Sequence, residues 1–160
     1  MPDSHSSASA AQSPHGILLL GLLLLFLFRV VAQLIQALAP VSFLPPFETW
    51  QSGALPYPAL VAFQVVILAV CTHVVYGVLS GRVARSFKMG KRLVVGGWIY
   101  LIAMAIRLLV GLTIAPAHFW FGATVPTFFH LVLAAFVLVW GSFHRAEEGH
   151  SGVLEAKGSL

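Results

Sequence analysis

Four long stretches of apolar residues dominate this chain, and they constrain its fold more than any other feature. Each exceeds the roughly 20 residues that an α-helix needs to cross a hydrocarbon core about 30 Å thick. Because lipid offers no partner to backbone N–H and C=O groups, a segment inside it must be helical or belong to a closed barrel. The stretches lack the alternation of apolar and polar residues that a membrane barrel needs. The predicted membrane-spanning helices are residues 16–39, 58–80, 93–115 and 117–143.

The composition supports the same fold class. Of the 160 residues, 59% are hydrophobic and only 9% are charged, whereas soluble domains carry about 25% charged residues. We therefore predict an all-α integral membrane protein with one four-helix transmembrane bundle over 16–143. The polar tails, 1–15 and 146–160, are predicted to be disordered. A small multipass chain without a long soluble part is typical of a bacterial inner membrane.

Basic residues concentrate in the segment "GRVARSFKMGKR", residues 81–92, and predict the orientation of the bundle. This segment holds five of the nine Lys and Arg residues. The positive-inside rule places it, and with it the N and C termini, in the cytoplasm. Such clustering in one loop argues against nucleic acid as a partner and for the lipid bilayer. The "ALA" at 37–39 has the form of a signal-peptidase site, but the apolar run before it is interrupted by Arg29 and preceded by no basic residue.

Polar side chains inside the predicted spans mark the candidate site. An Arg at the centre of a membrane helix costs about 2.5–3.5 kcal/mol, so Arg29 and Arg107 are expected to face the bundle interior. With a rise of about 1.5 Å per residue, most polar residues of the spans fall in the half of the membrane away from the basic segment. We therefore predict an outward-facing polar pocket. Its candidate residues are Arg29, Gln33, Gln36, Glu48, Gln64, Arg107, Thr127 and His130.

The turn-rich segment "PPFETWQSGALPYP", residues 45–58, contains Glu48, which is the only acidic residue between the two polar tails. Its prolines make it stiff, and its aromatic residues offer an apolar surface. One interpretation is a cap that folds back over the bundle, with Glu48 paired to Arg107 or, failing that, to Arg29. The alternative is that Glu48 is solvated in an exposed loop.

Several other residues in the spans carry structural predictions. Pro126 predicts a kink in the fourth span, which either lines a cavity or serves packing alone. The glycine pair at 96–97 predicts close helix packing. Cys71 is the only cysteine, so the chain forms no intrachain disulfide, and its apolar surroundings favour a small buried residue over a reactive thiol.

Two histidines raise the question of a cofactor. A b-type haem with two axial histidines needs imidazoles at matching depth on facing helices, and His73 and His130 lie on spans that run in the same direction. Their depths, counted along the spans, differ by roughly 4–5 Å. Haem b is permitted on this basis, as is contact of the same side chains with a quinone headgroup or an anionic lipid. A hydrogen-bonded structural histidine is the alternative.

Three functions remain open from the sequence. The first is a non-enzymatic membrane protein that binds a lipid or small molecule in the polar pocket, or acts as an accessory subunit of a membrane complex. The scarcity of carboxylates and of nucleophile motifs favours it over an enzyme. The second is a redox module that binds haem or a quinone. The third is a channel or transporter, which would need a homo-oligomer because four helices are few for a pore.

Overall fold

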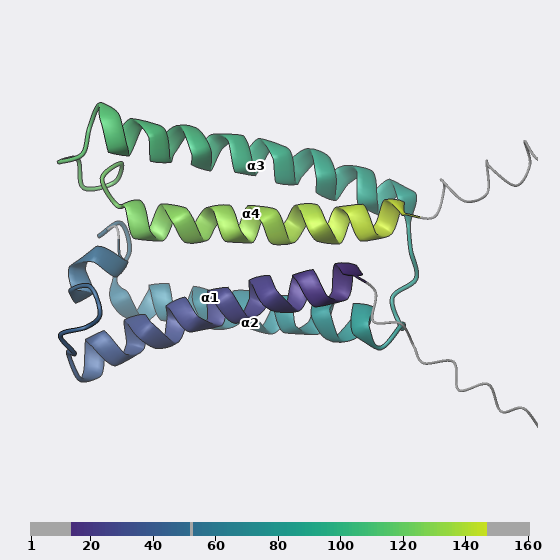
Figure 1. Cartoon of the computed structure of the whole chain (residues 1–160), viewed down its shortest axis with the longest axis horizontal. Helices are drawn as coiled ribbons and strands as arrows, with labels where there is room; N and C mark the ends of the chain where they lie inside the picture. Colours follow the sequence, from purple (N-terminus) through teal and green to yellow (C-terminus); the bar gives the residue numbers. More distant parts are fainter. Residues whose placement is uncertain (1–13, 52, 147–160) are drawn as a thin grey trace, which may run out of the picture.

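The computed structural model describes residues 14–51 and 53–146, and their regular structure is entirely helical (Figure 1). The elements are α1 (Pro14–Leu38), the short 3-10 helix η1 (Phe47–Trp50), α2 (Tyr57–Leu79), α3 (Phe87–Thr113) and α4 (Thr124–Arg145). All four α-helices are long and apolar enough to cross a membrane. The prediction of four long apolar helices is thus confirmed. The predicted tails lie outside the described residues, except that 14 and 15 begin α1 and 146 follows α4.

The first two helices match the predicted spans to within two residues at each end, whereas α3 begins earlier than predicted. It starts at Phe87 rather than at 93, so three of the five basic residues of 81–92 lie in its first turns. Lys and Arg are good helix formers, and their long side chains reach water from a helix end. The sequence prediction placed the start of the helix at the start of the apolar run, whereas the helix begins six residues earlier, within the basic segment.

The fourth helix begins later than predicted, at Thr124 rather than at 117. Pro126 therefore lies in the first turn of α4, where backbone N–H groups have no partner inside the helix and a missing N–H removes no bond. The predicted kink at Pro126 is wrong for this reason. Residues 117–123 form turns instead, and they belong to the loop between α3 and α4.

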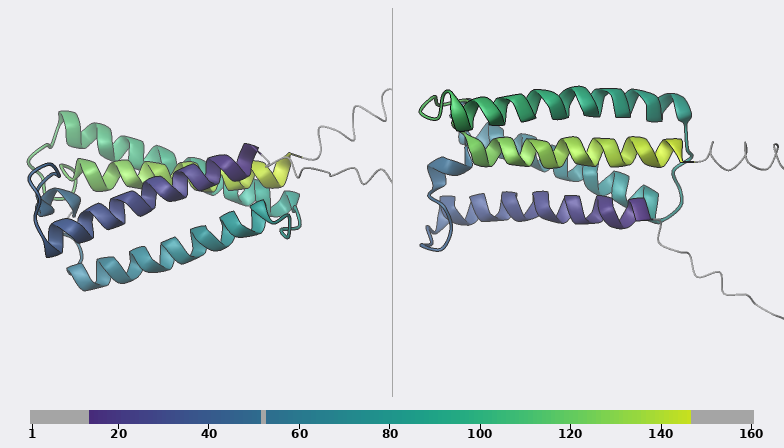
Figure 2. Two further views of the ribbon diagram at one scale, coloured as in Figure 1. Left: turned by 60° about the horizontal axis from the view of Figure 1, so that its bottom comes forward. Right: turned by 45° about the horizontal axis from the view of Figure 1, so that its top comes forward.

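The four α-helices run roughly along the same direction (Figures 1 and 2). α3 packs on α4, α4 packs on α1, and α1 packs on α2. The loop that joins α2 to α3 lies at the end of the bundle where α1 begins and α4 ends. The loops that follow α1 and α3 lie at the opposite end (Figure 1). The helices therefore alternate in direction, as four consecutive spans would.

Glycines bring α3 and α4 close together. A Cβ atom on Gly97 would lie 2.8 Å from Cδ2 of Leu138, and one on Gly141 would lie 2.8 Å from Cγ2 of Val94. The same atom on Gly96 would have nothing within 4 Å. Only one glycine of the pair at 96–97 therefore serves the interface. Small residues at such positions let two helix backbones approach, which is how membrane helices commonly associate.

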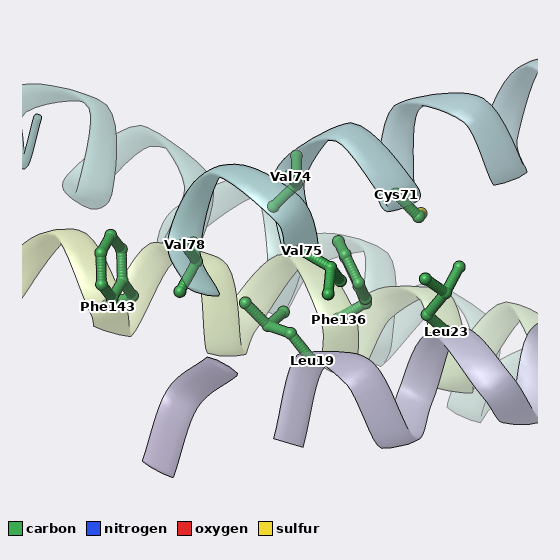
Figure 3. Packing of buried hydrophobic residues seen from close by; sticks show 8 residues of the cluster. All are labelled: Leu19, Leu23, Cys71, Val74, Val75, Val78, Phe136 and Phe143. Atoms are coloured by element: carbon green, nitrogen blue, oxygen red, sulfur yellow. The ribbon is translucent and has the colours of Figure 1, made fainter. Parts of the chain in front are cut away.

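An apolar core fills the half of the bundle in which α1 begins and α4 ends. Side chains from α1, α2 and α4 point toward one another there (Figure 3). The cluster consists of Leu19, Leu23, Cys71, Val74, Val75, Val78, Phe136 and Phe143. Cys71 is buried among these apolar side chains. The buried polar residues lie mainly in the other half of the bundle, beneath the loops that follow α1 and α3.

Candidate functional site

Arg29 of α1 is buried, at 5% exposed, and its guanidinium group holds the segment that follows α1. Nη2 donates to the backbone carbonyl of Trp50 (3.0 Å), and Nη1 donates to Oε1 of Gln33 (3.2 Å). The guanidinium carbon lies 5.5 Å from the centre of the Phe129 ring. Neutral acceptors and an aromatic face stabilise a cation but leave its charge in place. Arg29 therefore gives the centre of the bundle a net positive charge.

Two glutamines on the same face of α1 connect neighbouring segments. Oε1 of Gln33 accepts a second hydrogen bond from Nε2 of Gln64 (2.9 Å), which joins α1 to α2. Gln36 fixes the chain just beyond α1, because its Oε1 accepts from the backbone N–H of Val41 (2.6 Å) and its Nε2 donates to the carbonyl of Pro45 (2.7 Å). The predicted polar face of α1 is present, and its glutamines are engaged within the protein.

The segment after α1 packs against α1 and α4, but Glu48 does not hold it there. Trp50 does, because it is buried in a cluster with Ala32 of α1 and Phe129 of α4. Its Nε1 also donates to the carbonyl of Pro45 (2.9 Å) within the segment. Glu48 is exposed, and within the described residues it pairs with neither Arg29 nor Arg107. The predicted ion pair is wrong. Both arginines bond backbone carbonyls instead, and a carboxylate that remains in water avoids the cost of desolvation.

Arg107 of α3 is held by the loop between α3 and α4. Its Nε and Nη2 donate to the carbonyl of Trp120 at 3.2 and 2.7 Å, and its guanidinium carbon lies 4.1 Å from the centre of the indole ring. Gly111 lets this loop come close, since a Cβ atom there would collide with the carbonyl of Phe121. Among the described residues, nothing accepts a hydrogen bond from Nη1 of Arg107. Nη1 of this guanidinium group, with its two N–H donors, therefore remains for another molecule.

His130 of α4 is bonded to Tyr100 of α3, with Nδ1 and the tyrosine oxygen 2.6 Å apart. When the hydroxyl donates to Nδ1, the imidazole hydrogen is on Nε2. Arg29 and Arg107 line the same cavity as this imidazole. Sequence reasoning missed Tyr100. Its position seven residues before Arg107, about two turns of the same helix, was the available signal.

A cavity of about 280 Å³ lies beside these groups. Four of the predicted site residues line it: Arg29, Gln64, Arg107 and His130. The rest of the wall is largely apolar and includes Phe26, Phe63, Ile67, Trp120, Phe129 and Leu133. Among the described residues that form this wall, none carries a carboxylate. The cavity thus combines two guanidinium groups, an imidazole and a carboxamide with a hydrophobic lining.

The other four predicted residues do not line the cavity. Gln33 and Gln36 are the connectors described above, and Glu48 is exposed. Thr127 is fully buried, and its hydroxyl donates to the carbonyl of Ala123 (2.7 Å), so it stabilises the start of α4. The predicted polar half of the bundle therefore divides into residues that line the cavity and residues that hold the loops and the start of α4.

The two histidines proposed as haem ligands are not brought together. His73 is exposed on α2 and does not line the cavity, whereas His130 lines it and is bonded to Tyr100. A haem held by both imidazoles needs them to face each other across its iron. Axial ligation of haem b by His73 and His130 of one chain does not fit this arrangement.

No family model, curated protein or solved structure matches the chain. Its function is therefore inferred from the geometry and chemistry of the cavity.

Proposed function

We propose that this chain is a non-enzymatic multipass membrane protein that binds a lipid or small molecule in the cavity between its helices. One observation carries the proposal: two buried arginines, Arg29 and Arg107, share the wall of a single cavity that is otherwise mainly apolar. Ionisable side chains inside a membrane protein usually mark a functional site. A few polar groups in an apolar cavity are also typical of ligand sites.

The orientation follows from the basic residues around the loop between α2 and α3. Under the positive-inside rule this end of the bundle, where α1 begins and α4 ends, faces the cytoplasm. The cavity lies toward the other end and hence in the outer half of the membrane. Location in a bacterial inner membrane stays a prediction.

The chemistry of the wall favours binding over catalysis. Covalent catalysis needs a nucleophile within reach of a base, and Cys71 lies instead in the apolar core at the other end of the bundle. Paired carboxylates, which acid–base catalysis on sugars or peptides commonly uses, are missing from the described wall. The groups that remain are hydrogen-bond donors and apolar surfaces, which orient a ligand without transforming it.

The test is a substitution that fills the cavity with a larger side chain. Ile67 lines it, whereas its neighbour Val66 is 60% exposed on the outer face of α2. We expect the full-length protein, released into a mild detergent, to retain a bound lipid or small molecule that native mass spectrometry detects. Ile67→Trp should remove it and Val66→Trp should leave it. The same adducts on both variants would refute a ligand in this cavity.

A quinone is a second candidate ligand, and the bond between Tyr100 and His130 favours it. With Nδ1 occupied, Nε2 of His130 can donate to a quinone carbonyl, and the guanidinium group of Arg107 can donate as well. Extraction of the purified protein with organic solvent, followed by absorption spectra before and after chemical reduction, identifies a quinone. An extract without a redox-active chromophore would reject this candidate.

A further inference from the structure

We infer that the cavity selects an anionic single-chain amphiphile, one acyl or alkyl chain that ends in a carboxylate or phosphate, and that this molecule enters from the bilayer between α2 and α3. The inference rests on the proposed function and names the class of ligand. The headgroup would lie beside Arg107 and His130, and the chain would extend into lipid.

The charge balance is the first argument. Arg29 and Arg107 are both more than nine-tenths buried, and their hydrogen-bond partners are neutral. Within 14–51 and 53–146 the only carboxylate belongs to Glu48, which is exposed and does not line the cavity. Buried charges are normally paired, because an isolated one loses its hydration without compensation. An anion in the cavity would supply the missing negative charge.

The free donors are the second argument. Nη1 and Nη2 of Arg29 each donate one hydrogen bond within the protein, and its Nε is buried without a hydrogen-bond partner, so we assign Arg29 mainly the role of a nearby positive charge. Arg107 keeps Nη1, and His130 keeps Nε2, without a hydrogen bond to any described residue. The two side chains come from α3 and α4 and line the same cavity. These two donors, close to the positive charges of the two arginines, suit a negatively charged headgroup with two or more acceptor oxygens.

The size and position of the cavity are the third argument. At about 280 Å³ it lies just below the roughly 300–1,000 Å³ of typical ligand sites, so it holds a headgroup and the first carbons of a chain. The remaining carbons need an exit. α2 packs mainly on α1, and α3 packs mainly on α4, rather than on each other. Phe63 of α2 lines the cavity although it is 59% exposed, so it marks an apolar rim on the lipid side.

The experiment compares two probes that differ only in charge. Full-length protein in phosphatidylcholine nanodiscs is titrated with 5-doxylstearate or with its methyl ester, and the nitroxide quenches tryptophan fluorescence. Trp120 lines the cavity, so Trp120→Phe should remove the saturable component of quenching, whereas Trp98→Phe, on the exposed face of α3, should keep it. We expect the acid to bind at least tenfold more tightly than the ester, as charge-assisted hydrogen bonds require. Competition by tetradecanoate and by tetradecyl phosphate then identifies the headgroup.

Substitution of Arg107 separates a binding role from a structural one. Arg107→Gln should lower the preference for acid over ester by about tenfold or more, and Arg107→Lys, which keeps the charge, should retain most of it. Arg92→Gln, an exposed position at the opposite end, is the matched control. A purely structural Arg107 would weaken both probes equally and would overturn the assignment. Equal affinity of the unaltered protein for both probes would overturn the anionic class and leave a neutral ligand. Absence of saturable quenching by either would overturn the cavity as a lipid site.

Discussion

Replacing Gln33 by Glu should stabilise the protein, although it places a carboxylate inside the bundle. Gln33 is almost fully buried at 1% exposed. Its Oε1 accepts from both Arg29 and Gln64, whereas its Nε2 is buried without a hydrogen-bond partner. Gln33→Glu keeps the accepting oxygen and exchanges the unpaired donor for a second acceptor. It also gives the buried guanidinium group of Arg29 a counter-charge at nearly unchanged shape.

The expected gain follows from opposing contributions. A charged acceptor raises the hydrogen bonds from Arg29 and from Gln64 from about 1 to roughly 1.5–3 kcal/mol each, whereas the second carboxylate oxygen is as unpaired as the Nε2 that it replaces. Burial of the carboxylate costs several kcal/mol, which the attraction to Arg29, about 4 kcal/mol for unit charges 4 Å apart at an effective dielectric of 20, largely offsets. We expect a net stabilisation of about 1–2 kcal/mol. For a chain of this length this raises Tm by roughly 2–8 °C.

The assay is thermal unfolding in a non-ionic detergent at pH 7, followed by circular dichroism. Gln64→Glu is the matched control, because it makes the same chemical change at the residue that is hydrogen-bonded to Gln33. Gln64 donates to Oε1 of Gln33, so a carboxylate there would face an acceptor and should lower Tm. If both substitutions shift Tm in the same direction, the proposed network does not govern stability. Gln33→Glu should also reduce the preference of the cavity for the acidic probe, because it neutralises Arg29.

Two further pairs of substitutions test the loop after α1 and the interface of α3 with α4. Glu48→Gln should leave Tm unchanged because Glu48 is exposed, whereas Trp50→Phe, which removes the bond from Nε1 to Pro45, should cost about 1 kcal/mol; an equal loss from both would return Glu48 to a structural role. Gly141→Ala should destabilise the contact of α3 with α4 by about 1–3 kcal/mol relative to Gly96→Ala, since only the first adds a methyl group against Val94. Unfolding in mixed micelles measures the difference, and equal stability of the two variants would contradict the close approach of these helices.

The four helices could be predicted from the sequence, because an apolar stretch of about 20 residues or more indicates a helix long enough to cross a membrane. The same face of α1 carries Arg29 and Gln33, and the 3.6-residue period predicted this. The start of α4 was not accessible, because the apolar residues before Thr124 look alike whether they form turns or a helix. Pro126 is a signal for this start, because proline is favoured in the first turn of a helix.

The hydrogen-bond partners of the two arginines could not be predicted from the sequence, for a different reason. Side chains can be read from a sequence, but the direction of a loop carbonyl cannot, and Trp50 and Trp120 act through their carbonyl oxygens. The outward position of His73 was equally inaccessible. Gln64 and His73 of α2 are nine residues apart and lie on opposite faces of the helix, so its polar residues do not indicate which side faces the bundle.

The central place of α4 has a consequence for biogenesis. Translation delivers the helices in order, so α1 and α2 can pair while the ribosome is still working, but α3 emerges with its main partner not yet made. On the proposed membrane topology, Arg107 lacks the carbonyl of Trp120 until the loop after α3 has left the ribosome, and its charge then faces either the translocon or lipid. The loop before the last helix thus supplies the hydrogen-bond partner of a costly residue in the helix already made, and a chain that ends before Trp120 would lack this partner.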